Sequence, residues 1–252
     1  MTYFEGFAIA VPTANKQAFS EHAARFSEVV RDFGVKRQVE AWANDVPKGT
    51  LTDFYRAVDA KDDETVVFSW FEYPSKQARD AANEKFRTDP RMQELGSGMP
   101  FDGKRMILGG FDAIVESGQG PGQYVNGFIA PVPREKKDAY LEMTKRQAGI
   151  FLEHGALRLV QAWGDDIPEG EVTDFRRAVK AEPNETVVFA FIEWPSKQVN
   201  DEAWERIMKD ERMQPSGDVP FDGKRMFWGG FDVIVDTASN LQATSTAAPV
   251  TA

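Results

Sequence analysis

Two glutamates that end aromatic rows could do acid–base chemistry. If residues 65–73 form a strand, its alternation places Phe68, Trp70 and Glu72 on one face. The same kind of row recurs later in the chain and ends at Glu193. A carboxylate among aromatic rings is desolvated, which raises its pKa toward that of a general base. We therefore take Glu72 and Glu193 as candidate catalytic bases; a salt bridge at the strand end is the competing interpretation.

An arginine precedes each aromatic row in the sequence, and its position decides between the catalytic base and the salt bridge. The segment 52–58 is expected to form a hairpin with the strand of Glu72. One register would place Arg56 beside Glu72, where an ion pair keeps the carboxylate charged. The other register would place Asp53 there, and two adjacent carboxylates push one pKa up. Arg56 and its counterpart Arg177 are also candidates for holding an anionic group of a ligand.

Two tryptophans and two lysines complete the candidate ligand-binding residues. Each tryptophan shares a strand face with a polar residue two positions earlier, Glu40 or Gln161, and could line a pocket; core packing is the alternative. Each lysine follows an Asp-Gly turn and could bind an anionic group; cross-strand pairing with acids is the alternative. These candidates are Trp42, Trp163, Lys104 and Lys224.

The two histidines stand at non-equivalent positions. His22 falls in the middle of a predicted helix and is expected to be solvated, whereas His154 falls at a helix end, where the dipole favours its protonated form. Two histidines cannot build a multi-histidine metal centre, and the lack of cysteine excludes thiolate nucleophiles and disulfides. We therefore expect no metal and no cofactor.

Composition excludes further classes of function. The chain has 252 residues and a net charge of −10, from 40 acidic and 30 basic side chains. This charge repels phosphate backbones and anionic lipid, so we expect neither a nucleic-acid nor a membrane partner. No apolar run approaches the roughly 20 residues that span a bilayer, and the first residues lack a basic, apolar signal pattern. A cytoplasmic protein is the resulting expectation.

The chain is written twice. Glu64–Phe68 returns as Glu185–Phe189, and Pro100–Met106 returns as Pro220–Met226. The period of about 121 residues is the size of a domain rather than of a solenoid repeat. The predicted organisation is a first repeat over 1–116, a Gly-rich linker over 117–123, a second repeat over 124–236 and a disordered tail over 237–252.

Each copy predicts the same order of elements. In the first copy these are a strand over 4–11, a helix over 13–33, a strand over 37–43, a hairpin of 52–58 and 65–73, a helix over 74–88 and a strand over 103–115. This is an α+β fold of two ferredoxin-like β-α-β-β-β-α-β repeats. We expect the repeats to bury their apolar sheet faces against each other as a pseudo-dimeric α+β barrel; two independent domains are the alternative.

Four motifs carry a resemblance to a known family. They are W-x-D-D-[VI]-P-x-G, T-D-F-x-R-A-V, E-T-V-V-F-x-[FW]-x-E-[WY]-P-S-K and P-F-D-G-K-R-M-x-x-G-G-F. They resemble the YbaA-like family of small bacterial proteins of unknown function, in the dimeric α-β barrel superfamily. The second copy follows the pattern more closely, with Asp165 where the first has Asn44. The resemblance implies the fold; the wider superfamily holds cofactorless oxygenases, isomerases, haem-degrading enzymes and ligand binders.

Three hypotheses for function remain. The first is binding of a small molecule in a barrel or sheet–helix cavity. The second is a cofactor-independent oxygenase or isomerase with a strand glutamate as its base. The third is a non-catalytic interaction scaffold. With its pseudo-dimer formed internally, the chain is expected to be a monomer or a weak homo-oligomer.

Overall fold

Eight antiparallel strands form a closed barrel in the computed structural model, which describes residues 1–213 and 219–238. Around the barrel the order is β1-β3-β2-β8-β5-β7-β6-β4. The strands are β1 (Tyr3–Pro12), β2 (Arg37–Asp45), β3 (Glu64–Tyr73), β4 (Ile107–Gly118), β5 (Tyr124–Pro133), β6 (Arg158–Asp166), β7 (Glu185–Trp194) and β8 (Phe227–Asp236). The prediction of an α+β barrel is confirmed.

The two halves of the chain join at two seams. Strand β2 pairs with β8, and β4 pairs with β6, so the outer strands of each half are covered by the other half. Trp42 lies opposite Asp232 in the first seam, and Asp112 lies opposite Trp163 in the second. These ladders exclude the alternative of two independent domains.

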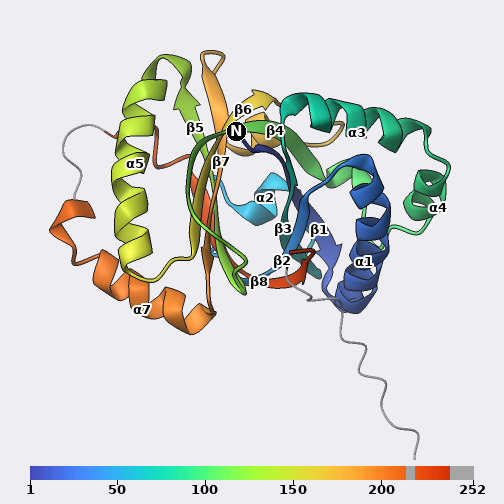
Figure 1. Ribbon diagram of the computed structural model, residues 1–252, viewed down its shortest axis with the longest axis horizontal. Helices are drawn as coiled ribbons and strands as arrows, with labels where there is room; N and C mark the ends of the chain where they lie inside the picture. Colours follow the sequence, from blue (N-terminus) through green and yellow to red (C-terminus); the bar gives the residue numbers. More distant parts are fainter. Residues whose placement is uncertain (214–218, 239–252) are drawn as a thin grey trace, which may run out of the picture.

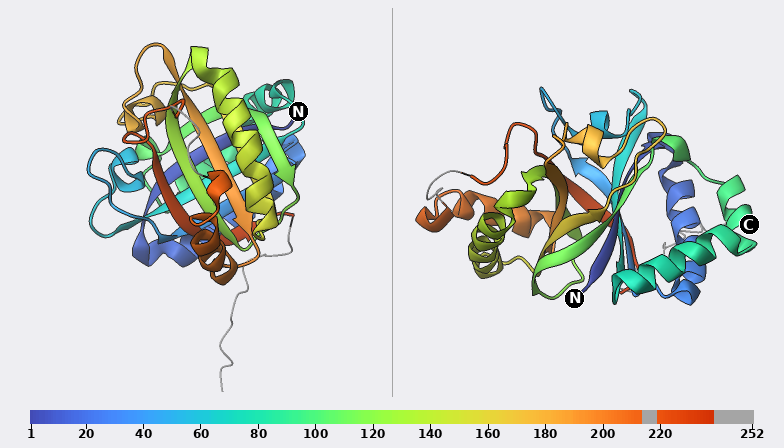
Figure 2. Two further views of the ribbon diagram at one scale, coloured as in Figure 1. Left: turned by 90° about the vertical axis from the view of Figure 1, so that its left-hand side faces the viewer. Right: turned by 90° about the horizontal axis from the view of Figure 1, so that it is seen from above.

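Two layers of helices cover opposite sides of the barrel (Figure 1). Helices α1, α3 and α4 lie on one side, and α5 and α7 on the other, which Figure 2 shows from above. Gly34 ends α1 in the left-handed conformation with φ 104°, and the Ser75 hydroxyl accepts a hydrogen bond from the Ala78 amide to cap α3. The helices are α1 (Lys16–Phe33), α2 (Phe54–Ala57), α3 (Lys76–Thr88), α4 (Arg91–Ser97), α5 (Lys137–Glu153), α6 (Phe175–Ala178) and α7 (Lys197–Ile207).

The segment 52–58, where we expected the first strand of a hairpin, contains the one-turn helix α2 over Phe54–Ala57. Asp53 has an extended backbone, and its carboxylate accepts a hydrogen bond from the Arg56 amide at 2.7 Å, which caps the one-turn helix α2. Asp174 caps α6 in the same way. Such an aspartate offers the backbone a local hydrogen bond that competes with strand pairing. The predicted order β-α-β-β-β-α-β is therefore wrong, since each half contributes four strands.

Strand β4 also differs from the prediction at both ends. A 3-10 turn over Gly103–Arg105, capped by Asp102, delays the strand until Ile107. The strand then continues to Gly118, into the stretch expected to be a flexible linker. Residues 239–252, which make up most of the predicted tail, lie outside the described residues.

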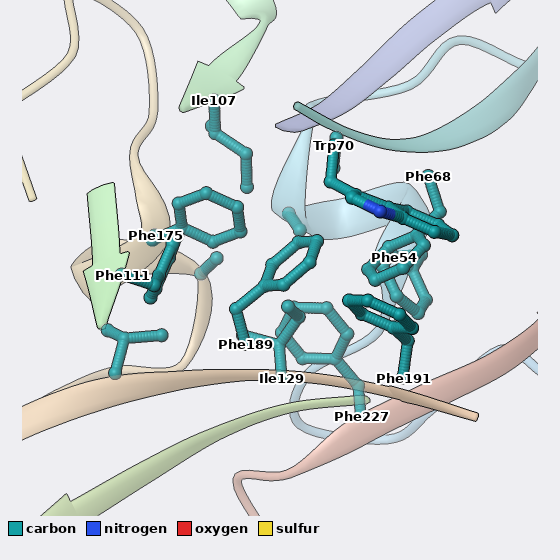
Figure 3. Close-up of a cluster of buried hydrophobic side chains, with 14 of the residues drawn as sticks. Phe54, Phe68, Trp70, Ile107, Phe111, Ile129, Phe175, Phe189, Phe191 and Phe227 are labelled. Carbon is teal, nitrogen blue, oxygen red and sulfur yellow. The ribbon is translucent and has the colours of Figure 1, made fainter. Parts of the chain in front are cut away.

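Aromatic rings from both halves fill the centre of the barrel, as Figure 3 shows. Phe68 stacks on Phe189 with ring centroids 4.6 Å apart, and Trp70 stacks on Phe191 at 4.2 Å. A Cβ atom at Gly6 would come within 2.6 Å of the Phe189 ring, so this strand position needs a glycine. Core side chains thus occupy the barrel centre, and the cavities described below lie between the sheet and the helices.

Candidate functional site

Glu72 and Glu193 meet at one end of the barrel, in a buried cluster of ion pairs. The Arg37 guanidinium lies 3.3 Å from the Glu72 carboxylate and 2.7 Å from that of Glu193. The Arg158 guanidinium lies 2.7 Å from Glu72 and 3.2 Å from Glu193. Each glutamate therefore has the same two arginine partners, one from each half of the chain. Two outer carboxylates complete this ion-pair cluster, Asp236 and Glu116.

The cluster keeps Glu193 ionised. Burial alone would raise the pKa of this carboxyl, but the hydrogen bonds and charge of Arg37 and the charge of Arg158 outweigh it and hold the pKa below its usual value. The Gly122 amide donates a further hydrogen bond at 3.0 Å. A carboxylate held in this way accepts a proton poorly at neutral pH. The catalytic role of Glu72 and Glu193 stays a prediction, and their surroundings match the competing interpretation of a strand-end salt bridge.

Arg56 and Arg177 lie away from this cluster. They belong to α2 and α6, which precede the starts of β3 and β7, whereas the glutamates stand near the ends of those strands. Eight residue steps separate the first residue of β3 from Glu72, or roughly 26 Å. Arg56 pairs instead with Asp53 at 3.0 Å, and Arg177 makes the corresponding pair in the second half. The structure does not bring these arginines to the candidate bases.

The predicted ligand-binding tryptophans and lysines also lie apart from one another. Trp42 is buried between the sheet and α1, and Trp163 is buried under α5. Lys104 is exposed in the turn before β4, with its ammonium 3.2 Å from Glu171, and Lys224 is exposed in the corresponding turn of the second half. Their roles in ligand binding stay predictions.

The histidines differ from each other as the sequence suggested, but His22 is not solvated. It is 8% exposed because it stands three residues after Phe19, on the buried face of α1, and it lines a cavity there. Burial and the charge of Arg25 lower its pKa, so the neutral imidazole dominates at pH 7. His154 follows the last residue of α5, and its ring lies 3.4 Å from the Asp210 carboxylate.

A cavity of about 230 Å³ lies between α1 and the sheet in the first half. We call it the Glu40 cavity. Its few polar side chains come from α1 and from neighbouring strands: His22, Gln38, Glu40, and Ser69, which pairs with Glu40 across β2 and β3. Most of its wall is aromatic or thioether: Phe7, Phe19, Phe26, Phe71, Phe101, Met92, Met99 and Met106. An apolar wall with a few converging polar groups is typical of a small-molecule site.

Glu40 carries the acid–base chemistry of this cavity. Its Oε1 accepts a hydrogen bond from Gln38 Nε2 at 2.8 Å, while its buried Oε2 has no hydrogen-bond partner among the described residues. Burial raises the pKa of Glu40 to about 7, against the opposing effect of Ser69 and Gln38. Near neutral pH the group therefore populates both protonation states, and it can take a proton from a bound molecule or return one.

The corresponding place in the second half has no carboxylate. Gln161 stands where the first half has Glu40, and Ala190 faces it where the first half has Ser69. The Gln161 side-chain oxygen accepts a hydrogen bond from the Tyr140 hydroxyl at 2.6 Å, so that it already has a donor. The acid of the Glu40 cavity is thus a property of one half of the molecule.

From the sequence, Glu40 was noted only as the neighbour of Trp42. A sheet–helix cavity was among the expectations, but Glu40 was not assigned to it. One signal was available in the strand itself. In a barrel that helices cover, both faces of a strand are buried, one by the barrel core and one by a helix. A glutamate in the middle of such a strand is buried whichever face it takes, so burial of Glu40 followed from the predicted fold.

Two kinds of feature are absent from residues 1–213 and 219–238. In these ranges no group of three or more histidine, aspartate or glutamate side chains is arranged to hold a metal ion. No helix within the same ranges is long and apolar enough to cross a bilayer.

Solved structures share this fold at low sequence identity. One, described as "putative monooxygenase", comes from Fusobacterium nucleatum; it is 12% identical, with 93% of each chain covered and a TM-score of 0.55. Another, described as an anthrone oxidase-like protein, is 15% identical, with 97% of this chain and 96% of that chain covered and a TM-score of 0.51. At such identities the likeness concerns the fold alone.

Sequence relatives confirm the resemblance seen in the motifs. The "Uncharacterized protein YbaA" of Escherichia coli K12 is 56% identical over 116 residues, which cover 46% of this chain and 99% of that protein. The family described as "Protein of unknown function (DUF1428)" matches twice, over residues 2–103 and 123–223. The two matches confirm the tandem duplication, and the chain belongs to the DUF1428 family.

Proposed function

We propose that the Glu40 cavity binds a small, mostly apolar molecule that carries one hydrogen-bond donor. Two observations carry this proposal: Glu40 lines the cavity, and its buried Oε2 has no hydrogen-bond partner among the described residues. Leaving a buried polar atom without a partner costs about 1–3 kcal/mol. A ligand that donates a hydrogen bond to this oxygen recovers that cost, and the aromatic and thioether wall favours an apolar body.

The size of the cavity limits the ligand. A cavity of about 150 Å³ is enough to hold a benzene ring, and the Glu40 cavity measures about 230 Å³. A molecule with a single ring and a small substituent therefore fits, with its donor group directed toward β2. Gln38 and Ser69 flank Glu40 and would help to orient that group.

A second candidate function is proton transfer without a cofactor, as in an isomerase or a cofactor-independent oxygenase. The pKa of about 7 at Glu40 favours it, because a base works best when its pKa lies near the working pH. This candidate moves the role of strand base from Glu72 and Glu193 to Glu40.

The proposal also takes the chain as a pseudo-dimer of two ferredoxin-like repeats. Each half orders its strands with the first and third at the centre, β4-β1-β3-β2 and β8-β5-β7-β6. This order supports the proposal of ferredoxin-like repeats, with four strands in each half rather than the five we expected. A pseudo-dimer lets one half keep a working cavity while the other changes.

Phenol and toluene test the binding proposal, because they have similar rings and only phenol donates a hydrogen bond. Titration by NMR or calorimetry is expected to show phenol binding at least tenfold tighter than toluene. Glu40→Met is expected to abolish that preference, while the matched variant Gln161→Met in the second half retains it. Equal binding of both probes to the unmodified protein would overturn the proposal.

The proton-transfer candidate has its own measurement. Cyclohexanone in D₂O exchanges its α-hydrogens slowly, and a base held next to them speeds the exchange. Exchange catalysed by the protein should rise with pH through about 7 and disappear in Glu40→Gln. Phenol binding without catalysed exchange would leave the protein as a binder and reject the enzyme candidate.

A further inference from the structure

A second and larger cavity of about 510 Å³ lies in the other half of the molecule. Residues of α7 are part of its lining. Figure 1 shows this helix on the side of the barrel that α5 and α7 cover. Residues of β5, β8 and α7 line it, and Asp45 at the end of β2 reaches it from the first half across the β2–β8 seam. It shares no lining residue with the Glu40 cavity.

Two aromatic side chains line this cavity at positions where the first half has a non-aromatic residue. Trp204 of α7 corresponds to Asn83, and Trp228 of β8 corresponds to Leu108. The Trp228 side chain is 43% exposed, which makes it one of the large apolar side chains that remain open to solvent. Faces of indole and phenol rings attract organic cations.

In the first half, the place equivalent to this cavity holds the side chain of Arg79. The Arg79 guanidinium lies 5.1 Å from the Tyr3 ring centroid, with Nη2 2.7 Å from Asp166 and 2.9 Å from the Tyr3 hydroxyl. Asp166 comes from the end of β6, so it too crosses a seam between the halves. The Tyr3 ring of the same half and the Asp166 carboxylate of the other half thus hold an internal guanidinium.

In the second half this guanidinium is missing. The ring is kept as Tyr124 and the carboxylate from across the seam as Asp45, but Asn200 stands where the first half has Arg79. Asn126 stands where the first half has Glu5, a second carboxylate 3.8 Å from Arg79. No described residue forms an ion pair with Asp45. A short, neutral side chain replaces a long, charged one, and a cavity opens at the same place.

The electrostatics of the second cavity favour positive charge. Burial and the charges of Asp45, Asp201 and Asp232 all raise the pKa of Tyr124, so that three carboxylates act on the ring that lines the cavity. One cation already contacts these groups. The Lys197 ammonium lies 5.8 Å from the Tyr124 ring centroid and 2.7 Å from the Asp201 carboxylate. The Lys197 side chain is 38% exposed, so an incoming cation can displace it.

We propose that this second cavity binds a small organic cation, of the guanidinium or alkylammonium class, which takes the place that Arg79 occupies in the first half. Its charge would face Asp45 and Asp201, and its apolar part would lie against Trp204 and Trp228. The site is independent of the Glu40 cavity and of the function proposed there.

Benzylguanidinium chloride is a suitable probe, with benzyl alcohol as its neutral counterpart. Titration of the full chain, followed by tryptophan fluorescence and by NMR, is expected to show binding of the cation and at least tenfold weaker binding of the alcohol. Equal binding of both compounds, or no binding of the cation, would overturn the proposal. Benzyltrimethylammonium serves as a second cation and shows whether guanidinium is preferred over alkylammonium.

Three variants locate the binding. Asp45→Asn, at an exposed position, is expected to weaken benzylguanidinium at least fivefold, while the matched Asp166→Asn in the first half leaves it unchanged. Lys197→Met removes the competing ammonium and is expected to strengthen binding. Binding unaffected by Asp45→Asn would place the cation elsewhere and reject this site.

A fourth variant rebuilds the arrangement of the first half. The pair Asn126→Glu and Asn200→Arg restores the residues that stand as Glu5 and Arg79 there. It is expected to fill the cavity with an internal guanidinium and abolish probe binding. Thermal unfolding shows whether this variant folds; if it does not, the outcome rests on Asp45→Asn and Lys197→Met, which act at partly or fully exposed side chains.

Discussion

The centre of the barrel and its outer faces have diverged between the two halves to different degrees. In the centre, residues from the two halves meet their own equivalents: Phe68 stacks on Phe189. At the barrel end, Glu72 and Glu193 share the same two arginines, one supplied by each half. A change in one half at these places alters the contacts of the other half as well.

The outer faces show the opposite behaviour. Glu40 lines a cavity under α1, while its counterpart Gln161 is hydrogen-bonded to Tyr140. Arg79 fills a site beside Tyr3, while its counterpart Asn200 lines a cavity. The residues that differ on the outer faces do not contact their own equivalents, because α1, α3 and α4 lie on the opposite side of the barrel from α5 and α7. A substitution on one outer face therefore needs no matching change at the equivalent position. Duplication therefore left the two cavities free to acquire different chemistry.

Arg37→Met is expected to have the largest effect on this comparison. It leaves Glu193 and Asp236 without a guanidinium that now lies 2.7 and 2.8 Å from them. Removing one partner from a buried ion pair costs about 3–5 kcal/mol of unfolding free energy. Urea denaturation measures the loss.

The matched controls for that variant are two other arginines. Arg158→Met should cost about as much as Arg37→Met, because the two arginines have equivalent roles in the ion-pair cluster. Arg56→Met removes an ion pair whose arginine side chain is 56% exposed, and it should cost no more than about 1 kcal/mol. Losses that differ widely between Arg37→Met and Arg158→Met would show that the shared end of the barrel is not symmetric in energy.

Glu40→Gln is expected to change how stability depends on pH. In the unfolded chain the carboxyl has its ordinary pKa of 4.5, and in the folded protein the pKa is about 7. The folded state therefore binds the extra proton between these values, and the contribution of Glu40 to stability falls as pH rises through this window. Glutamine does not titrate, so the variant should gain about 2 kcal/mol over the unmodified protein between pH 5 and pH 8.

Urea denaturation at the two pH values checks this expectation. The difference between variant and unmodified protein should be small at pH 5 and large at pH 8. A difference that is the same at both values would mean that Glu40 keeps an ordinary pKa, which would also remove the support for its role as a base.

Much of the fold follows from local sequence signals. The repeat gave the two halves, Gly34 and Ser75 marked helix ends, and runs rich in β-branched and aromatic residues marked the strands. The segment 52–58 did not follow, because its alternating pattern suits a strand while the Asp53 side chain caps a helix. A local hydrogen bond of that kind overrides the alternation, and a reading of periodicity does not include it.

The candidate site depended on contacts that are distant in sequence. Glu72 finds its arginines 35 and 86 residues away, at Arg37 and Arg158. Strand parity predicts which residues share a face with Glu72 but not which other strands end beside it. Glu40 and Asn200 show the same limit: their types were visible, while the cavity next to each depends on how helices seat against the sheet.

Gln161→Glu sharpens the comparison from the other half. It places a carboxyl under α5 at the position that Glu40 holds under α1, with the Tyr140 hydroxyl as a hydrogen-bond donor. Because burial opposes the charged form, the variant should lose stability as pH rises, by about 1–2 kcal/mol between pH 5 and pH 8. A hydrogen bond from the Tyr140 hydroxyl would stabilise the charged carboxylate. This pH-dependent loss of unfolding free energy should therefore be smaller than the pH-dependent gain expected for Glu40→Gln. A loss that does not depend on pH would argue for a steric cause.

The smallest expected effect tests whether the divergence is confined to the cavity faces. Ser75 caps α3 and Ser196 caps α7 through the same hydrogen bond, to the amides of Ala78 at 3.2 Å and Val199 at 3.3 Å. Ser75→Ala and Ser196→Ala should each cost about 1 kcal/mol, as expected for the loss of a helix N-cap. Both helices begin with the same cap, but only α7 lines the large cavity. Equal losses of unfolding free energy in urea denaturation would mean that the two helices are stabilised alike and differ only in the side chains that face the cavities. A clearly larger loss in one half would instead show that the whole helical layer has diverged.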